Sequence, residues 1–233
     1  MPEGGSVLKR KKCAVAFLAA EGALYAAFLA LDLTGRGGLS VPIKYAGILL
    51  CLGFSLLACV NWGGDRLVPA ALALTAGADW FLLVRNDHYA LGVALFLCVQ
   101  GVYFVRLRRA GAPAAYPLRS GLALGAGLAV CAAGMAVGQA APLNLLAALY
   151  FSQLLSNTVL AWRLKGRRWR RFALGLTLFA GCDVCVGLFN ALPAASPLYP
   201  AASVGMWLFY LPSQVLIALS ALPEKEAPHE KKQ

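Results

Sequence analysis

The chain has 233 residues, of which 60% are hydrophobic and only 13% are charged. Soluble domains are typically about 45–50% apolar and about 25% charged, so these proportions exclude a soluble domain, a disordered chain and a disulfide scaffold. Lys and Arg outnumber Asp and Glu by 21 to 10, and a net charge of +11 usually raises the question of nucleic acid. Because most of the remaining sequence is suited only to lipid, we expect an all-α, multi-pass membrane protein that binds no nucleic acid.

Eight apolar stretches are long enough to cross a bilayer as helices. A hydrocarbon core about 30 Å thick needs about 20 mostly apolar residues per helix, because lipid cannot satisfy exposed backbone polar groups. The predicted spans are residues 13–33, 41–60, 67–84, 90–105, 118–137, 143–162, 172–192 and 201–222. They form a single eight-helix domain, residues 1–222, and we expect the polar tail, residues 223–233, to be disordered.

The basic residues predict the orientation of these spans. If the N-terminus is cytoplasmic, 18 of the 21 basic residues fall in cytoplasmic segments, and the outer segments hold only Arg36, Lys44 and Arg85. This asymmetry follows the positive-inside rule for eight spans with both termini in the cytoplasm. The basic excess therefore serves as a topological signal and attracts anionic headgroups, and the chain is expected in the plasma membrane, or in the inner membrane if it is bacterial.

An internal repeat is a further prediction. A shift of 104 residues aligns Ala76-Gly77-Ala78-Asp79 with Ala180-Gly181-Cys182-Asp183 and brings the first and fifth spans into approximate register. Two halves of four spans, residues 13–105 and 118–222, would be related by an axis along the membrane normal. The alternative is chance similarity among apolar helices.

Acidic residues inside the spans are candidates for function, because a charge in lipid costs about 3 kcal/mol at the centre of a helix. Asp79 and Asp183 each lie roughly 17–18 Å from the cytoplasmic end of a span that runs in the same direction, so both can face one site. The structural alternative is a pair of buried, hydrogen-bonded acids that hold the helical bundle together. Asp32 lies at an outer helix end and is expected to reach water, whereas Glu21 is either a structural partner or a site residue.

Polar residues at helical spacing accompany the two acids. Three predicted spans carry such a face, and each face can equally serve for hydrogen bonds between helices. The faces consist of Gln100 and Tyr103, of Tyr150, Gln153 and Asn157, and of Tyr210 and Gln214. The seven Cys are expected to pack as small apolar residues, and with two His in the chain neither a metal centre nor a cofactor is predicted.

Paired carboxyl groups in a dry site titrate apart, so one can donate a proton while the other accepts one. Such a pair suits the addition of water to a lipid, proton-coupled transport or intramembrane proteolysis. The proteases need Gly-x-Gly-Asp and Tyr-Asp motifs, which neither acid has here.

At this point the chain resembles the lysoplasmalogenase-like (YhhN-type) membrane proteins. The run from Leu72 to Phe104 contains G-A-D-W-F-L-L, G-V-A-L-F and Q-G-V-Y, which is similar to the family's G-D-x-x-L and G-x-x-x-F-x-x-x-H-x-x-Y patterns. The segment L-F-A-G-C-D resembles L-F-x-x-S-D, and the run from Tyr210 to Gln214 resembles Y-x-x-x-Q. Gln100 replaces the usual His, so no proton can be carried at that position, and Cys182 replaces the usual Ser.

The resemblance implies hydrolysis of the vinyl ether bond of a lysophospholipid, with release of a fatty aldehyde and glycerophosphoethanolamine or glycerophosphocholine. Asp79 and Asp183 would then be the acid and the base, in an order left open. The supporting residues would be Gln100, Tyr103, Asn157, Tyr210, Gln214 and Glu21. A transporter or lipid-binding bundle is the alternative, although no span is broken near the acids by Pro or Gly as transporter helices often are.

Overall fold

The computed structural model of the chain describes residues 3–113 and 142–224, together with some of the residues between 121 and 135. Within these residues the chain is helical and contains no strand. Its elements are α1 (Glu3–Leu33), α2 (Gly37–Trp62), α3 (Leu67–Asp79), the π-helix η1 (Trp80–Arg85), α4 (Tyr89–Arg109), α6 (Pro142–Arg163), α7 (Arg167–Ala191) and α8 (Leu198–Leu219). The fifth predicted span, residues 118–137, lies largely outside the described residues.

Seven of the predicted spans are confirmed as helices that are long and apolar enough to cross a membrane. The main difference concerns their ends, because α1 begins well before the predicted residue 13 and includes the basic residues at positions 9–12. Lys and Arg are good helix formers, and their long side chains can reach water from a helix end. Basic residues therefore mark the membrane boundary without ending the helix, and α4 likewise continues to Arg109.

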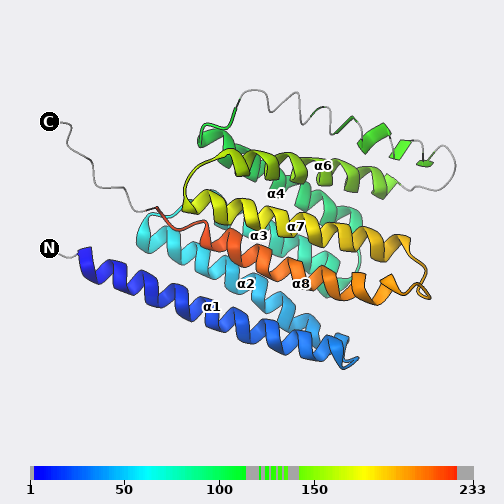
Figure 1. Ribbon diagram of the computed structural model, residues 1–233, viewed down its shortest axis with the longest axis horizontal. Helices are drawn as coiled ribbons and strands as arrows, with labels where there is room; N and C mark the ends of the chain where they lie inside the picture. The colour runs from blue at the N-terminus through cyan, green and yellow to red at the C-terminus, as the bar shows by residue number, and fades with distance from the viewer. Residues whose placement is uncertain are drawn as a thin grey trace.

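Helix α8 is the central element of the described bundle (Figure 1). It packs along α7 and also contacts α1, α2 and α3, whereas α1 lies at the edge and contacts only α2 and α8. Among the described helices, α3 and α7 do not pack against each other. The two helices that carry the acids are therefore joined through α8 on one side and through α4 and α6 on the other.

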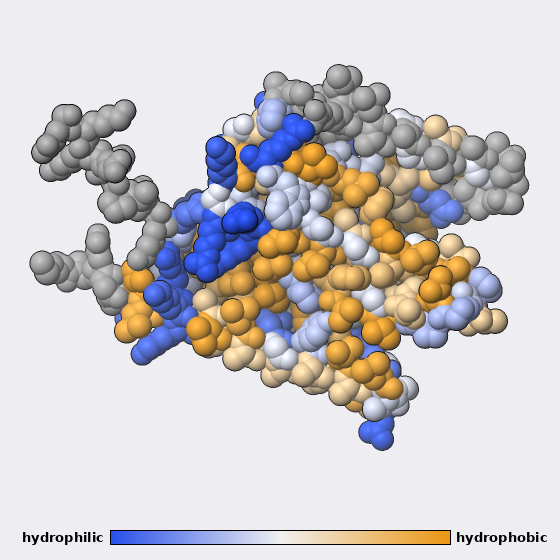
Figure 2. All heavy atoms as spheres, viewed as in Figure 1, coloured by the Kyte–Doolittle hydropathy of each residue, from blue (hydrophilic) through white to orange (hydrophobic). Residues whose placement is uncertain are grey.

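The start of α1 and the end of α8 lie at the same end of the bundle. Arg10 donates a hydrogen bond to the backbone oxygen of Pro223 (3.3 Å), which ties these two segments together. Hydrophilic side chains gather at this end, while hydrophobic side chains cover much of the visible sides of the helices (Figure 2). We call it the basic end, because Arg106 and Arg168 also lie there.

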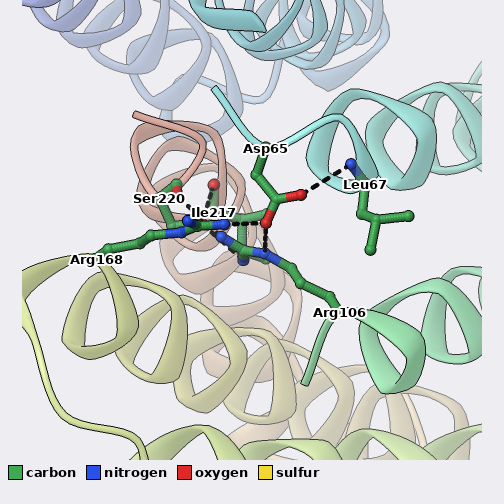
Figure 3. A network of polar contacts seen from close by, with 6 residues as sticks. All are labelled: Asp65, Leu67, Arg106, Arg168, Ile217 and Ser220. Carbon is green, nitrogen blue, oxygen red and sulfur yellow. Dashed lines mark hydrogen bonds and ion pairs between the residues drawn. The ribbon is translucent and has the colours of Figure 1, made fainter. Parts of the chain in front are cut away.

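A buried ion network closes the basic end of the bundle (Figure 3). Asp65, in the turn between α2 and α3, accepts a hydrogen bond from Nε of Arg106 (2.8 Å) and a further one from Arg168 at the start of α7. The other guanidinium nitrogens of Arg106 donate to the side chain (3.0 Å) and the backbone oxygen (2.8 Å) of Ser220. One carboxylate therefore connects α3, α4, α7 and the end of α8.

Arg106 is only 2% exposed, which is rare for a charged side chain. Besides its hydrogen bonds, its guanidinium lies 4.2 Å from the ring centroid of Phe172 and 4.9 Å from that of Trp169. Aromatic faces attract a planar cation, most strongly where water is excluded. The burial of this charge is thus compensated by an ion pair, two hydrogen bonds to Ser220 and two rings.

The ion network makes stability sensitive to acid. Burial raises the pKa of Asp65, but the charge and hydrogen bond of Arg106, the backbone N–H of Leu67 and the charge of Arg168 together outweigh burial and hold the pKa below its ordinary value of 3.8. A carboxyl group whose pKa is lower in the folded state contributes stability above its unfolded pKa and loses it as the pH falls through the folded pKa. We expect wild type to have a higher Tm in detergent than Asp65→Asn. This difference in Tm should be largest at pH 6 and should shrink steadily below a pH of about 4. A difference independent of pH would contradict this account.

Candidate functional site

Asp79 is the last residue of α3 and lies inside the bundle. It is 4% exposed, and its Oδ2 accepts a hydrogen bond of 2.6 Å from the hydroxyl of Tyr210 on α8. Tyr210 is itself buried. Two residues that sequence analysis placed in the site, from spans far apart in the chain, are therefore in direct contact.

The backbone widens into the π-helix η1 immediately after Asp79. Leu82 of η1 occupies the space that a side chain at Gly92 would need, since a Cβ there would lie 2.4 Å from Cγ of Leu82. Single π-turns inside helices occur frequently at functional sites. The sequence predicted one continuous helix here without a change of its geometry. The wider turn fits because α4 has a glycine, with no side chain, at position 92.

Asp183 on α7 has a similar environment. Its Oδ2 accepts a hydrogen bond of 2.6 Å from the hydroxyl of Tyr150 on α6, and the carboxyl group is partly buried. The neighbouring Cys182 is buried and has a free thiol. Each of the two acids is thus held by one tyrosine, although each tyrosine comes from a different helix.

An aromatic cluster lies between the two acid–tyrosine pairs. Phe179, one turn before Asp183, is 1% exposed, and its ring centroid lies 5.5 Å from that of Tyr210 and 6.3 Å from that of Tyr150. Phe96 on α4 completes the cluster at 5.5 Å from Phe179 and 5.7 Å from Tyr150. Both acids therefore border one aromatic cluster, even though their helices do not pack together.

The partners of the two acids do not follow the predicted repeat. Asp79 is bonded by a tyrosine from the second predicted half of the chain, whereas Asp183 is bonded by a tyrosine from its own half. The duplication therefore remains a prediction, and the two acids have unequal surroundings.

Gln100 and Asn157, two of the predicted supporting residues, are in contact. The amide nitrogen of Asn157 lies 3.0 Å from both the backbone oxygen and the side-chain oxygen of Gln100. This contact fixes the Gln100 side chain with its oxygen engaged and its amide nitrogen without a hydrogen-bond partner. Position 100 therefore presents a donor inside the bundle.

Tyr103 and Gln214 are also fully buried. The hydroxyl of Tyr103 has no hydrogen-bond partner, and its ring packs edge-on against Phe172 at 5.1 Å. Gln214 donates to the hydroxyl of its neighbour Ser213 (3.1 Å), while its side-chain oxygen has no partner. These two residues add unpaired polar atoms to the interior.

Glu21 lies apart from the aromatic cluster, where α1, α2 and α8 meet. Its Oε1 accepts from the thiol of Cys51 (3.3 Å), and Oε2 has no partner. Gly47 leaves room for this carboxyl group, because a Cβ there would lie 3.2 Å from Oε2 of Glu21 and 2.9 Å from Leu211. In the described part of the chain, the hydrogen-bond partner of Glu21 is thus Cys51 rather than another predicted site residue.

Asp32 does not simply face water. It forms an ion pair of 2.7 Å with Lys44, which is 6% exposed and also lies 4.6 Å from the ring centroid of Trp207. Lys44 counts as an outer basic residue, but it lies three residues into a predicted span. Its buried charge needs an opposite charge nearby, and Asp32 supplies it.

The ion pair of Asp65 and Arg106 is a further feature that the sequence does not predict. The two residues are 41 positions apart in the chain, so no local pattern links them.

The arrangement offers two carboxyl groups, two phenol groups and an aromatic surface inside a membrane-type bundle. Such groups can donate a proton, accept one and stabilise a cation between them. Among the residues that the structure describes, no group of three or more His, Cys, Asp or Glu side chains is placed to hold a metal ion.

Comparison with known proteins gives one match. The family model described as the YhhN family matches residues 39–221, which include both acids and all the predicted supporting residues except Glu21. Searches of curated proteins and of solved structures found no match. The match covers more than three quarters of the chain and agrees with the motifs around Asp79 and Asp183, so this chain belongs to the YhhN family.

Proposed function

We propose that this protein is a membrane hydrolase that cleaves the vinyl ether bond of lysoplasmalogens. The observation that carries the proposal is the pair of intramembrane carboxyl groups, Asp79 and Asp183, each hydrogen-bonded to a buried tyrosine beside one aromatic cluster. Membership of the YhhN family and the apolar helices support it further. The substrate is itself a membrane lipid, which fits a site between membrane helices.

The reaction needs one proton donor and one proton acceptor. Protonation of the vinyl ether at its β-carbon converts the adjacent carbon and oxygen into an oxocarbenium ion. Water adds to that carbon and loses a proton to a base, which gives a hemiacetal. The hemiacetal then breaks its bond to the glycerol oxygen, which takes up a proton, and releases a fatty aldehyde and glycerophosphoethanolamine or glycerophosphocholine. A carboxylic acid and a carboxylate can perform these transfers without a cofactor.

The two carboxyl groups would share these roles. One donates the proton to carbon, and the other stabilises the cation and accepts the proton from water. The tyrosine hydroxyls of Tyr150 and Tyr210 engage one oxygen of each carboxyl group, which leaves the other oxygen to face the substrate. The rings of Phe179 and Phe96 offer π-faces to the oxocarbenium ion, whose charge they would stabilise.

The supporting residues supply unpaired polar atoms to the interior. Gln100, held by Asn157, directs its amide nitrogen into the interior, where an oxygen acceptor can take its hydrogen bond. Tyr103 and Gln214 offer a hydroxyl and an amide oxygen at other points of the same interior. The orientation with both termini in the cytoplasm remains our proposal, based on the basic end of the bundle.

The direct test supplies purified protein in detergent with lysoplasmenylcholine and lysoplasmenylethanolamine and measures aldehyde release. The matched control lipids carry the same headgroup and either a saturated 1-alkyl ether or a 1-acyl ester. We expect aldehyde from the vinyl ethers alone, because only their double bond can be protonated to an oxocarbenium ion. Failure to release aldehyde from either headgroup would refute the proposal.

One observation favours a second candidate, a proton-coupled transporter. The third span widens into the π-helix η1 directly after Asp79, and π-turns occur frequently at functional sites, while acids inside membrane helices serve as proton relays in transporters. Proteoliposomes with a pH gradient and an internal pH dye separate the two functions. Lipid-driven proton uptake without aldehyde release would favour transport, and aldehyde release without proton uptake would favour the hydrolase.

The tyrosine partners give a graded prediction. A hydrogen bond to a charged group contributes about 1.5–3 kcal/mol, so Tyr210→Phe and Tyr150→Phe should each lower kcat by roughly tenfold or more. Tyr89→Phe is the matched control, because Tyr89 is exposed and its hydroxyl bonds only to Asn86. Unchanged kcat in both site variants would show that the tyrosines have no part in the reaction.

A further inference from the structure

Four fully buried side chains in the interior hold polar atoms without hydrogen-bond partners. They are the hydroxyls of Thr75 and Tyr103, the amide nitrogen of Gln100 and the amide oxygen of Gln214, and none of these residues is more than 1% exposed. An unpaired polar atom in an apolar interior costs about 1–3 kcal/mol. Each such atom in a folded protein calls for a physical explanation, and an ordered water is one of the usual ones.

These atoms lie between the acid site and the basic end, spread over about two helical turns along the bundle. Thr75 is one helical turn before Asp79 on α3, and Gln214 is one turn after Tyr210 on α8, so both lie on the same side of the bonded Asp79–Tyr210 pair. Because α3 and α8 run in opposite directions there, Thr75 and Gln214 lie at similar depth.

The register between α3 and α4 places the other two residues. Asp65 bonds to Arg106 at the basic end, and farther along Gly77 faces Leu95, 3.6 Å from where its Cβ would lie. Tyr103 is therefore about one turn, and Gln100 about two turns, from the Arg106 network on the side toward Asp79. The four side chains thus follow one another from near Asp79 toward the Arg106 network, and we call Thr75, Gln100, Tyr103 and Gln214 together the polar layer.

We propose that the polar layer binds water inside the membrane, and that this bound water supplies the water consumed at the acid site. Buried waters typically make about three hydrogen bonds to otherwise unpaired polar groups. The layer offers donors from Gln100, acceptors from Gln214 and hydroxyls that can do both, which is the mixture that water requires. The reactant role rests on the proposed hydrolysis, whereas the binding of water does not.

The bound water has a defined part in the reaction. Its oxygen forms the new bond to the oxocarbenium carbon, one of its protons passes to the carboxylate, and the other stays on the hemiacetal hydroxyl. When the hemiacetal collapses, that second proton passes to the carboxylate that first protonated the carbon, and the other carboxyl group gives its proton to the departing glycerol oxygen. Each turnover consumes one water molecule.

X-ray radiolytic footprinting of the purified protein tests the binding of water without any substrate. Hydroxyl radicals formed from bound water oxidise adjacent side chains, so Tyr103 should be oxidised several-fold faster than Phe54, which is 4% exposed and stacks on Phe17. The exposed Tyr89 provides the scale for contact with bulk water. Oxidation of Tyr103 no faster than Phe54 would overturn the proposal.

Two variants sharpen the test. Gln214→Leu removes one water-binding group and should lower the oxidation of Tyr103 several-fold while leaving Tyr89 and Phe54 unchanged. Thr75→Val removes a hydroxyl without changing shape, and it should leave Tm unchanged or lower it if water is bound there. A higher Tm for Thr75→Val would show a dry, unpaired hydroxyl and contradict the proposal.

Activity separates the reactant role from the proposed function. Wild-type protein that oxidises Tyr103 rapidly but releases no aldehyde would retain the bound water and refute the hydrolase. If wild type is active, Gln214→Leu should lower kcat more than it changes KM, because the missing group holds water rather than lipid. If Gln214→Leu lowers the oxidation of Tyr103 but keeps wild-type activity, the bound water is not the reactant. That result would leave the binding of water itself intact.

Discussion

Replacement of Asp79 or Asp183 by Asn is expected to lower aldehyde release from lysoplasmenylcholine by at least about 10²-fold, the usual range for loss of a positioned acid or base. Asn keeps the shape and a hydrogen-bond acceptor for the partner tyrosine, but its amide neither donates a proton to carbon nor accepts one from water. Because both carboxyl groups act in one reaction, we expect the double variant to be little worse than either single variant.

The matched control for both is Asp87→Asn. Asp87 lies in the exposed turn after η1, where it pairs with Arg85, so its loss should leave kcat unchanged. Each variant is compared with wild type by size-exclusion profile and Tm in the same detergent, so that loss of the fold is distinguished from loss of chemistry. A folded Asp79→Asn or Asp183→Asn protein with full activity would remove that acid from the mechanism.

Arg106→Met is expected to cause the largest loss of stability. Removing one partner of a buried ion pair costs about 3–5 kcal/mol where the remaining charge is left unpaired. Asp65 keeps its ion pair with Arg168, so we expect a loss toward the lower end of this range. Here the change strips Asp65 of its 2.8 Å partner and leaves Ser220 without two donors. Met keeps most of the volume against Phe172 and Trp169, so the effect reports the charge rather than a cavity.

The measurement is the Tm in detergent, with Arg85→Met as the control. The Arg85–Asp87 pair lies in an exposed turn, and exposed ion pairs contribute little to stability, so this variant should leave Tm unchanged. In addition, Asp65→Asn should cost less in the Arg106→Met background than in wild type, because its main partner is already absent. Equal costs in both backgrounds would show that the two residues do not interact.

Much of the architecture could be predicted from the sequence, because lipid imposes a simple rule on each span. A helix that satisfies its own backbone needs about 20 apolar residues in succession, and that pattern can be counted without knowing what the helix packs against. Seven such helices are confirmed within the described residues. The family motifs around Asp79 and Asp183 are local as well, so the family could be predicted and is confirmed.

The partners of the candidate site could be predicted only in part. Helical spacing placed Tyr210 and Gln214 on one helix face, and Gln100 and Tyr103 on another. It did not predict which of these faces contacts which acid. Asp79 is bonded by Tyr210 across 131 positions of the chain, and that pairing depends on α8 packing between α3 and α7. Tyr150 was noted only as a polar position, since its role depends on α6 lying beside α7.

The sequence by itself therefore determined that the chain is helical, that its helices are long and apolar enough for a membrane, and that two of them carry an acid. Each of these follows from the free energy needed to place a polar group in lipid. That free energy depends on the residue and its depth, wherever its helix lies in the bundle. Only the tertiary structure decided the tyrosine bonded to each acid, the Arg106 network and the polar layer. Those features are contacts between helices, and contacts depend on how the helices pack, which no single span encodes.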